Sequence, residues 1–302
     1  MGGEPLVEIG RTAALEAEWA RCRWIWNECV ARSEKAHAED DKCGPARLDK
    51  MLTEARTANA WLREGGSTGD FSSIQNLRYA FKDAAKHGVT VLASSGDGGA
   101  TNTTADGDGD YPYKVNSWPS SDPLVTSVGG TQLHLDDDGD RIAPDSVYND
   151  DGAGGGGQSH VFARPSYQDG VKQVVGDRRG TPDISMSAAV NGGAWVYSSY
   201  DPKAVGWEVY VGTSEASPLF AGIAALADQV AGHRLGDIHQ ALYALYAQSA
   251  QNPSTGIVDV RDGTNNSYSG VTGYTAVKGY DMATGVGTID AARFVPALAK
   301  EG

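Results

Sequence analysis

The pattern of apolar residues changes near residue 68, which predicts two unlike segments. Residues 11–43 contain no glycine or proline, and apolar side chains recur there every three to four residues, as in an amphipathic helix. A second helix is predicted over residues 46–63, after a Gly-Pro break. We therefore expect residues 1–68 to form a short, all-helical segment and residues 69–302 to form a separate domain.

In the second segment, helical and strand patterns alternate and glycine is frequent. Residues 71–87 show helical spacing, with Ile74, Leu77, Phe81 and Ala85 on one face and Gly88 as the stop signal. A short apolar run follows at once, which predicts a buried parallel strand. The further predicted elements are a strand over 124–128, a hairpin over 132–142 that turns at Asp138-Gly139, a strand over 195–198 and an apolar helix over 217–231. This alternation predicts an α/β fold with a mainly parallel sheet.

Ser214 is a candidate nucleophile. It lies in the run GTSEASP at 212–218, directly before the predicted apolar helix. Glycine allows a sharp turn, and a serine at a helix N-terminus faces N–H groups and a dipole that favour a developing oxyanion. The alternative is a helix cap, since serine and threonine are common at that position and Pro218 suits a first turn. The motif alone leaves both interpretations open.

Asp97 is a candidate acid of the same site. It follows the predicted strand in the run SSGDGG at 94–99, and the carboxyl ends of strands carry the sites of open α/β sheets. A carboxylic acid there can donate a hydrogen bond to an oxyanion while it is protonated. The alternative is an ordinary Gly/Asp turn.

Several motifs in the second segment resemble the sedolisin family of serine-carboxyl peptidases. The resemblance covers about residues 70–302 and rests on ASSGDGG at 93–99, WPSSDPLVTSVGGT at 118–131, GGGG at 154–157, FARPSYQ at 162–168, GTPDIS at 180–185, GTSEASPLFAGI at 212–223 and YDMATGVGTID at 280–290. It implies a subtilisin-like fold, with a mainly parallel sheet flanked by helices. It also implies acid-range hydrolysis of a peptide or protein substrate, with Ser214 as nucleophile and Asp97 as oxyanion donor.

The resemblance further implies a calcium site near the C-terminus. Asp259 and Asp281 match the family's carboxylate ligands, and the carbonyl groups of Val260, Val277 and Gly279 match its main-chain ligands. Calcium accepts six to eight oxygen ligands and takes carbonyl groups readily. The alternative is a solvated loop rich in glycine and aspartate.

This sequence departs from the family pattern at the catalytic base. A glutamate, oriented by an aspartate four residues away, accepts the proton of the serine in such enzymes, and no equivalent stretch precedes SSGD here. In residues 1–69 only Glu4 and Glu8 are acids four apart, and they do not match the family motif. Residues 7–64 instead resemble the N-terminal helical segment of OrfB/TnpB-type transposases, in CRWIWNECVARSE at 22–34 and CGPARLDKMLTEARTANAWLREG at 43–65.

We therefore expect a truncated domain that lacks the N-terminal part of the subtilisin-like sheet. One sheet edge and one apolar face would then be exposed. The expected function is a serine-type endopeptidase by resemblance, impaired by the missing Glu/Asp pair. The alternative is a non-catalytic pseudo-peptidase or calcium-binding relic of a gene fusion.

Charge and hydropathy restrict the partners. The net charge is −14, whereas sequence-independent binding to nucleic acid needs clustered Lys and Arg. The transposase-like helices themselves carry 10 basic and 12 acidic residues within residues 1–69, so a nucleic-acid role is the weakest hypothesis. No apolar run reaches the ~18–20 residues of a membrane-spanning helix. We expect a monomer without a membrane segment. The family is typically secreted, but the N-terminus shows no signal peptide, so the localisation stays open.

Overall fold

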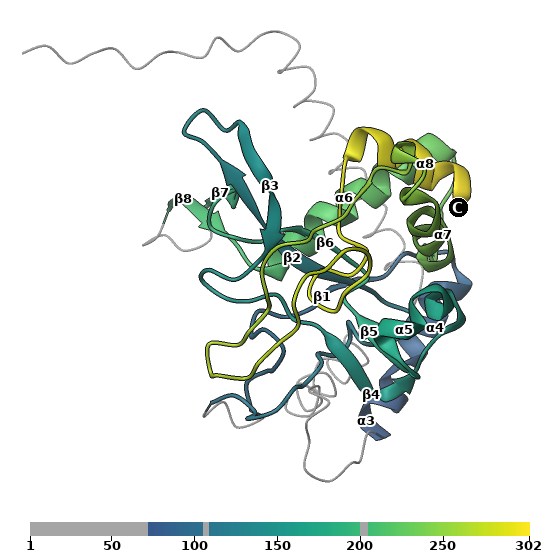
Figure 1. Ribbon diagram of the computed structural model, residues 1–302. Coiled ribbons are helices and arrows are strands. Elements are labelled where there is room, and N and C mark those ends of the chain that lie inside the picture. The colour runs from purple at the N-terminus through teal and green to yellow at the C-terminus, as the bar shows by residue number, and fades with distance from the viewer. Residues whose placement is uncertain (1–71, 105–108, 200–204) are drawn as a thin grey trace, which may run out of the picture. The chain divides into compact units, whose positions relative to one another are not determined.

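The computed structural model describes residues 72–104, 109–199 and 205–302 (Figure 1). The chain divides into two units, Met1–Thr57 and Ala58–Gly302, and every described residue belongs to the second. The predicted N-terminal helices, the transposase-like stretch and the boundary at residue 68 lie outside the described residues. These stay predictions.

The central sheet is built around one long strand, β2 (Thr126–Leu135). β2 runs parallel to β1 (Leu92–Ser94) and to β6 (Ile184–Ser187), and antiparallel to β3 (Arg141–Val147). Its first residues pair with β1, its middle with β6 and its last residues with β3. The predicted α/β fold with a mainly parallel sheet is confirmed.

The predicted β-hairpin is the β2–β3 connection. Gly139 has φ +83°, a left-handed conformation that glycine adopts without strain, and its amide donates to the carbonyl of Asp136 at 3.0 Å. The sequence Asp138-Gly139 therefore turns the chain where the alternation of apolar and polar residues predicts.

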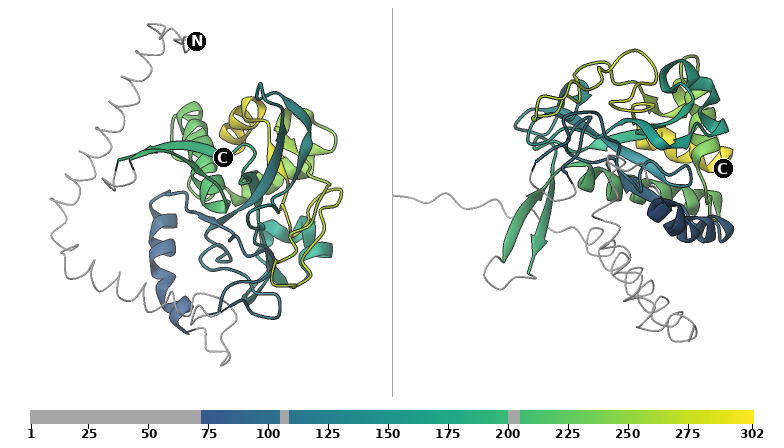
Figure 2. Two further views of the ribbon diagram at one scale, coloured as in Figure 1. Left: turned by 90° about the vertical axis from the view of Figure 1, so that its left-hand side faces the viewer. Right: turned by 90° about the horizontal axis from the view of Figure 1, so that it is seen from below.

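Three helices cover the sheet and enclose the main core (Figures 1 and 2). They are α6 (Thr213–Ala231), α7 (His239–Ser249) and α8 (Ala291–Glu301). α6 packs against β1, β2, β6 and α8, and α7 packs against α8. The buried residues at this interface include Val128, Ile184, Ala216, Phe220, Leu242, Leu245, Phe294 and Leu298.

Smaller elements complete the domain. They are α3 (Ser72–Leu77), α4 (Tyr79–Lys86), β4 (Gly157–Ala163), η1 (Ser166–Val171), α5 (Lys172–Val175), β5 (Arg178–Thr181), β7 (Ala194–Ser198), β8 (Gly206–Tyr210), η2 (Pro253–Thr255), β9 (Ile257–Val258) and β10 (Thr288–Ile289). β4 pairs with β5, β7 with β8 and β9 with β10, all antiparallel. Within the described residues, no helix has both the length and the hydropathy to span a membrane.

The helix predicted over residues 71–87 is interrupted at Arg78, where α3 ends and α4 begins. The Arg78 guanidinium bonds the carboxylate of Asp122, with Nε at 2.6 Å and Nη2 at 3.1 Å. Ile74 is buried against Trp118, as the predicted apolar face requires, but Ala85 is exposed. The prediction that Ala85 belongs to the buried face is therefore wrong.

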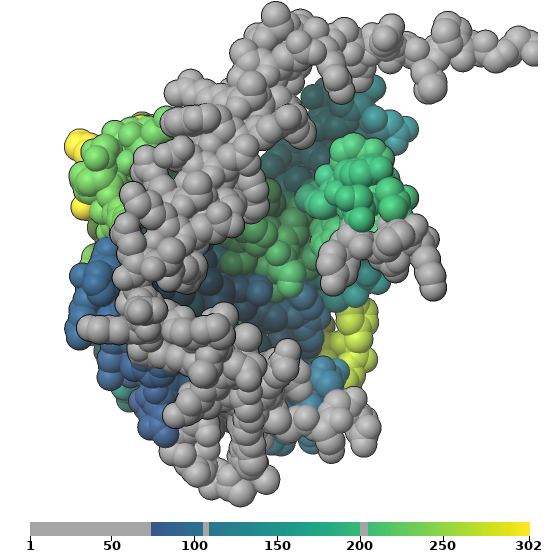
Figure 3. All heavy atoms as spheres, turned by 180° about the vertical axis from the view of Figure 1, so that it is seen from behind, coloured from purple at the N-terminus to yellow at the C-terminus, as the bar shows by residue number. Residues whose placement is uncertain are grey.

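The expected open sheet edge and exposed apolar face are both present in the described residues. β1 has only β2 as a neighbour there, and its three residues are half-exposed, whereas the sequence predicted a buried strand. On α6, which Figure 3 shows in green from behind, Leu219, Leu226 and Val230 are 40%, 50% and 60% exposed. These positions are seven and four residues apart, so they form one stripe along the helix.

Candidate active site

Ser214 lies at the start of α6, one residue inside the helix. Gly212, with φ +86°, turns the chain from β8 into the helix and is its N-terminal cap residue, without a side-chain cap bond. Ser214 is exposed, and neither its hydroxyl nor its amide N–H has a hydrogen-bond partner in the described part of the chain. Ser214 is therefore not the helix cap, and its hydroxyl is not engaged by another described residue.

Pro218 contributes to this geometry from the next turn of the helix. An α-helical N–H at position 218 would donate to the carbonyl of Ser214, and proline has no N–H. The sequence thus leaves the backbone of Ser214 less constrained than that of an interior helical residue.

Asp97 lies beside Ser214 because its side chain is bound to the preceding residue. Its Oδ1 accepts hydrogen bonds from the amide of Thr213 at 2.7 Å and from the Thr213 hydroxyl at 2.9 Å. The same hydroxyl accepts from the amide of Gly96 at 3.1 Å. Oδ2 has no hydrogen-bond partner among the described residues, so it is the oxygen left open to a ligand.

Gly212 permits this close approach. A Cβ at position 212 would lie 2.9 Å from Oδ2 of Asp97, and the positive φ itself disfavours other residues. The turn that the sequence predicted at this glycine therefore also makes room for the carboxyl group.

A pocket of about 380 Å³ opens beside Asp97. Its wall includes two further carboxylates, Asp110 and Asp151, and the ring of Tyr268. Within the described ranges, none of the three carboxylates of this pocket takes part in an ion pair. The space next to the candidate acid is thus polar and open to solvent.

The described residues do not supply the implied base. The only carboxylate between residue 72 and β1 is Asp83, an exposed residue of α4 whose carbonyl bonds His87. Glu4 and Glu8 lie outside the described residues. The structure therefore brings together Ser214 and Asp97 and places no described base against Ser214.

Glu215, which the sequence reasoning did not consider, is the acid nearest to Ser214 in the chain. It is buried, whereas Ser214 is exposed, so the two side chains point to different sides of the helix. Burial raises the pKa of Glu215 to about 7, and the backbone of Ala194 opposes this shift. The sequence feature that could have drawn attention to Glu215 is its position inside the motif GTSEASP.

The two predicted calcium-ligating carboxylates are both bound to one loop. Asp281 is buried, and its Oδ2 accepts from the amide of Val277 at 3.0 Å. The carboxylate of Asp259 accepts from the amide of Gly279 at 3.0 and 3.2 Å and pairs with Arg261 at 2.6 Å. The hydroxyl of Tyr246 lies in the electric field of both carboxylates. Its pKa is raised mainly by burial and further by these two negative charges.

These residues offer oxygen atoms, the donors that calcium prefers, and the calcium site stays a prediction. Among the described residues, the carbonyl oxygens of Val260, Val277 and Gly279 accept no hydrogen bond, and no cationic side chain pairs with Asp281. Burial raises the pKa of Asp281, as expected for a carboxylate without a positive partner. The described residues contain no group of three His, Cys, Asp or Glu side chains that could hold a metal ion, so such a site would depend on carbonyl ligands.

A buried polar network around Asp183 was also missed. Arg179 binds both oxygens of Asp183, at 2.8 and 2.5 Å, and Tyr243 donates to Oδ1 at 2.8 Å. His239 lies between Asp183, at 3.5 Å, and Asp237, at 2.5 Å. In the sequence, Asp183 could have been noticed because it lies within the motif GTPDIS. Nothing in the sequence pointed to His239, a lone histidine 56 residues later.

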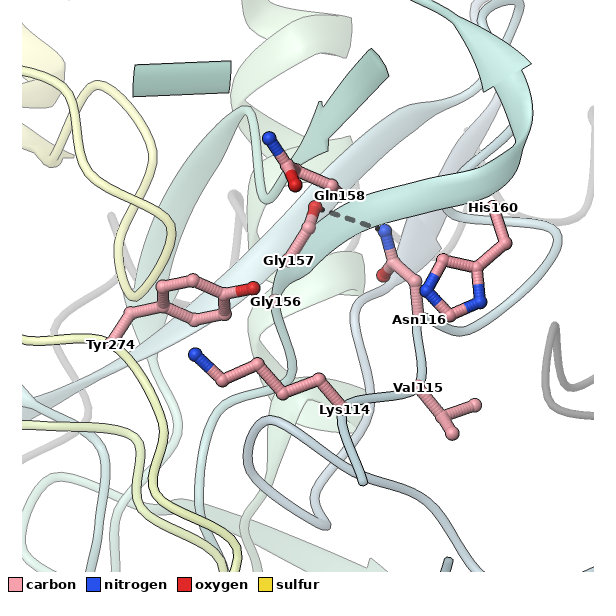
Figure 4. A pocket seen from close by; sticks show the side chains of 8 residues that line it. All are labelled: Lys114, Val115, Asn116, Gly156, Gly157, Gln158, His160 and Tyr274. Carbon is pink, nitrogen blue, oxygen red and sulfur yellow. Dashed lines mark hydrogen bonds between the residues drawn. The ribbon is translucent and has the colours of Figure 1, made fainter. Parts of the chain in front are cut away.

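A second pocket, of about 170 Å³, lies between β4 and the loop that carries Tyr274 (Figure 4). The Lys114 ammonium lies 3.9 Å from the centre of the Tyr274 ring, and the Asn116 amide donates to the carbonyl of Gly157 at 3.1 Å. This pocket contains none of the residues predicted to be catalytic or metal-binding.

Comparisons with known proteins relate the described domain to peptidases. No family model matches the chain. Kumamolisin from Bacillus sp. (strain MN-32) is 34% identical over 236 residues, which are 75% of this chain and 39% of that protein. Sedolisin from Pseudomonas sp. (strain 101) is 35% identical over 229 residues, 74% of this chain and 37% of that protein. The chain thus spans about two fifths of the length of these relatives.

A solved structure gives the same result for the fold. Pseudomonas sedolisin, a serine-carboxyl proteinase complexed with two molecules of pseudo-iodotyrostatin, superposes with a TM-score of 0.64 at 33% identity. The match covers 76% of this chain and 61% of that chain. The part of this chain that these comparisons cover therefore has the subtilisin-like fold of sedolisin and is related to the sedolisin family of serine-carboxyl peptidases.

Proposed function

We propose that this chain is a serine-type endopeptidase of the sedolisin family by descent, with an incomplete catalytic site and reduced activity. Ser214 is the nucleophile and Asp97 is the acid that stabilises the oxyanion. The observation that carries the proposal is the placement of Asp97 against Thr213, next to an unengaged Ser214 at a helix N-terminus. The substrate is a peptide or an unfolded protein.

The chemistry follows from this placement. The hydroxyl oxygen of Ser214 bonds to the carbonyl carbon of the scissile peptide bond, its proton passes to water, and the carbonyl oxygen becomes an oxyanion. When this intermediate collapses, the C–N bond breaks, the leaving amine takes a proton from water, and a second water molecule then hydrolyses the ester on Ser214. The free amide of Ser214, the positive end of α6 and the protonated Oδ2 of Asp97 favour that negative charge. Because a carboxyl group donates only when protonated, this stabilisation is available in the acid range.

The described residues supply no base for Ser214, and this determines how fast the proposed reaction runs. The proton of the Ser214 hydroxyl has no described acceptor, and general base catalysis typically contributes about 10²–10⁴-fold. We expect hydrolysis that is slower than that of a complete site by a factor of this size.

A hydrolysis assay tests the proposal. A denatured protein is incubated across roughly pH 3–7 with calcium, using the wild type, Ser214→Ala and, as matched control, Ser217→Ala three residues further along α6. We expect slow cleavage by the wild type and by Ser217→Ala, and none by Ser214→Ala. Equal rates in all three proteins would mean that the resemblance reflects ancestry and not chemistry.

The second candidate is a non-catalytic, calcium-binding module. It is favoured by the unbonded carbonyl groups of Val260, Val277 and Gly279 beside two carboxylates. In this proposal the ion would be held by these five residues and would stabilise the C-terminal loop. Calorimetric titration of the metal-free protein with calcium distinguishes it from the first, since binding without Ser214-dependent hydrolysis supports the module alone.

A further inference from the structure

The pocket of about 170 Å³ in Figure 4 has basic side chains in its wall, although the protein is strongly acidic. Lys114 and His160 line it, and no carboxylate does. The guanidinium group of Arg178 lies close by, 3.4 Å from the carbonyl oxygen of His160. The whole chain carries 39 acidic and 25 basic residues. The charge at this pocket is therefore opposite in sign to the net charge of the chain.

The ammonium group of Lys114 is held in place but is not neutralised. It lies 3.9 Å from the centre of the Tyr274 ring, which is a cation–π contact, and 3.4 Å from the carbonyl oxygen of Gly273. In the part of the chain that the structure describes, Lys114 takes part in no ion pair. An ammonium group has three donors, so Lys114 keeps donors for an anion that enters the pocket.

The neutral polar groups of the wall differ in what they can offer a ligand. The side-chain amide of Asn116 donates to the carbonyl of Gly157 at 3.1 Å, and that of Gln158 donates to the carbonyl of Val175 at 2.9 Å. The Tyr274 hydroxyl lies near Gly157, where an added Cβ would be 3.1 Å from it. Burial raises the pKa of Tyr274, so this hydroxyl keeps its proton and can donate.

The pocket lies next to the candidate acid Asp97. A Cβ at Gly96 would lie 2.9 Å from Oγ of Ser117, the residue that follows one wall of the pocket in the chain. The carbonyl of Gly96 also accepts the amide of Gly155 at 2.7 Å, and Gly155 directly precedes the opposite wall. Consecutive Cα atoms are about 3.8 Å apart, so a peptide bound at Asp97 can place a side chain in the pocket.

Size and charge restrict which group can enter. A volume of about 170 Å³ is below the ~300–1,000 Å³ of typical small-molecule sites, so the pocket suits one side chain and not a whole ligand. The neighbouring pocket of about 380 Å³ contains the carboxyl groups of Asp97, Asp110 and Asp151, which repel a further negative charge when they are ionised. An acidic side chain of a peptide at Asp97 is therefore favoured in the smaller pocket.

We propose that the pocket beside Lys114 is a subsite for a glutamate or aspartate side chain of a bound peptide. The carboxylate accepts hydrogen bonds from the Lys114 ammonium and the Tyr274 hydroxyl, and bonds to charged groups are roughly twice as strong as neutral ones. The inference rests on the proposed function, because it names the substrate class of the same site. Binding itself needs no base for Ser214, so the subsite can be tested without hydrolysis.

Peptide binding to the full chain with Ser214→Ala tests the proposal. Fluorescence anisotropy at about pH 6, where a free glutamate side chain is ionised, compares labelled, C-terminally amidated heptapeptides of alanine and serine with a central glutamate, glutamine or lysine. We expect the glutamate peptide to bind about tenfold or more tightly than the other two. Adding Lys114→Met, which keeps an unbranched side chain without the charge, should abolish this preference. Adding Lys82→Met, at an exposed lysine of α4, should leave it unchanged.

Three results would overturn the subsite. They are equal binding of the glutamate and glutamine peptides, a preference that survives Lys114→Met, and a glutamate peptide that does not bind below about 1 mM. A glutamine peptide with a free C-terminal carboxylate separates the two sources of this group. If it binds as tightly as the amidated glutamate peptide, the pocket takes a chain terminus and the side-chain assignment is wrong.

The salt dependence gives a readout that needs no change at Lys114. Between about 0.1 and 1 M salt the screening length falls from about 10 to 3 Å, so the preference for glutamate should shrink while the affinity for the glutamine peptide stays the same. A preference that salt does not change would contradict recognition by charge. Glutamate preference without Ser214-dependent hydrolysis would support the subsite and refute only the proposed activity, whereas hydrolysis without the preference would refute only the subsite.

Discussion

The amide and the hydroxyl group of Thr213 donate to the same oxygen of Asp97, at 2.7 and 2.9 Å. These two residues are 116 positions apart in the chain, one after strand β1 and the other at the start of α6. Their contact binds the loop after β1 to the turn before Ser214. It also leaves the second oxygen of Asp97 without a hydrogen-bond partner among the described residues.

Gly212→Ala is expected to break this contact. The new Cβ would lie 2.9 Å from Oδ2 of Asp97 and would be held at a positive φ, which costs about 1–2 kcal/mol before any clash. We expect a loss of at least 2 kcal/mol in the free energy of unfolding, measured in urea. Gly222→Ala is the control, because nothing lies within 4 Å of its Cβ in the exposed middle of α6, and it should stabilise by about 0.5–1 kcal/mol. Similar effects of the two changes would contradict the packing described for Gly212.

Asp97→Asn is expected to change the pH dependence of catalysis and to leave the fold intact. The asparagine oxygen can still accept both bonds from Thr213, and its amide donates at every pH, whereas a carboxyl group donates only when protonated. The residual rate of peptide hydrolysis should therefore extend into the neutral range in the variant. A rate profile across pH 3–8 that is identical to that of the wild type would exclude Asp97 as the donor.

The domain is expected to be most stable in mildly acidic solution because of His239. Burial would lower its pKa, but its hydrogen bonds to Asp183 and Asp237 outweigh burial and raise the pKa above 6.5. The stabilisation is therefore complete below about pH 6.5 and is lost as the pH rises through the raised value. Burial would raise the pKa of Asp183, but Arg179 and His239 lower it, so its contribution is present above about pH 3.8 and is lost at stronger acidity.

His239→Gln tests this assignment. The variant should lose about 3 kcal/mol of unfolding free energy at pH 5, and the difference from the wild type should shrink as the pH rises above 7. His87→Gln, a change at an exposed histidine, should stay within about 0.5 kcal/mol of the wild type. A loss in His239→Gln that is the same at pH 5 and pH 8 would show that the imidazolium charge is not involved.

Calcium is expected to stabilise the C-terminal loop. At a concentration of one hundred times the dissociation constant, a bound ion adds about 2.7 kcal/mol, which corresponds to a rise of about 5–10 °C in Tm. The gain should vanish in Asp281→Asn, which neutralises the buried carboxylate, and persist in Asp262→Asn, which removes an exposed one from the same segment. Thermal unfolding with calcium and with a chelator provides the measurement, and an unchanged wild-type Tm would exclude the site.

Elements with strong periodicity were predictable from the sequence. The hairpin at Gly139, strand β7 and helix α6 lie where the alternation and the apolar run placed them. The break at Arg78 was not predicted, nor was the bond from its guanidinium to Asp122, 44 residues away. The burial of β1 was misjudged for a related reason: an apolar run does not show how many neighbours a strand has.

In the candidate site, only the residues that lie in recognisable motifs and were read there as catalytic could be predicted. Ser214 and Asp97 come from two motifs, and the structure places them next to each other. Glu215 was overlooked because a polar residue in a helical motif is expected at the surface, and only the folded structure shows that it is buried. The His239 network likewise depends on contacts between residues far apart in sequence.

Acylation of Ser214 is the most direct test of the central claim. An activated ester of a short peptide needs less help from a base than a peptide bond does, so the incomplete site should still react with it. After incubation at about pH 5 and quenching in acid, we predict an acyl group on Ser214 by peptide mapping, reduced in Gly212→Ala and absent in Ser214→Ala. Acyl groups spread equally over other serines, or none on Ser214 in the wild type, would contradict the assignment of Ser214 as a nucleophile.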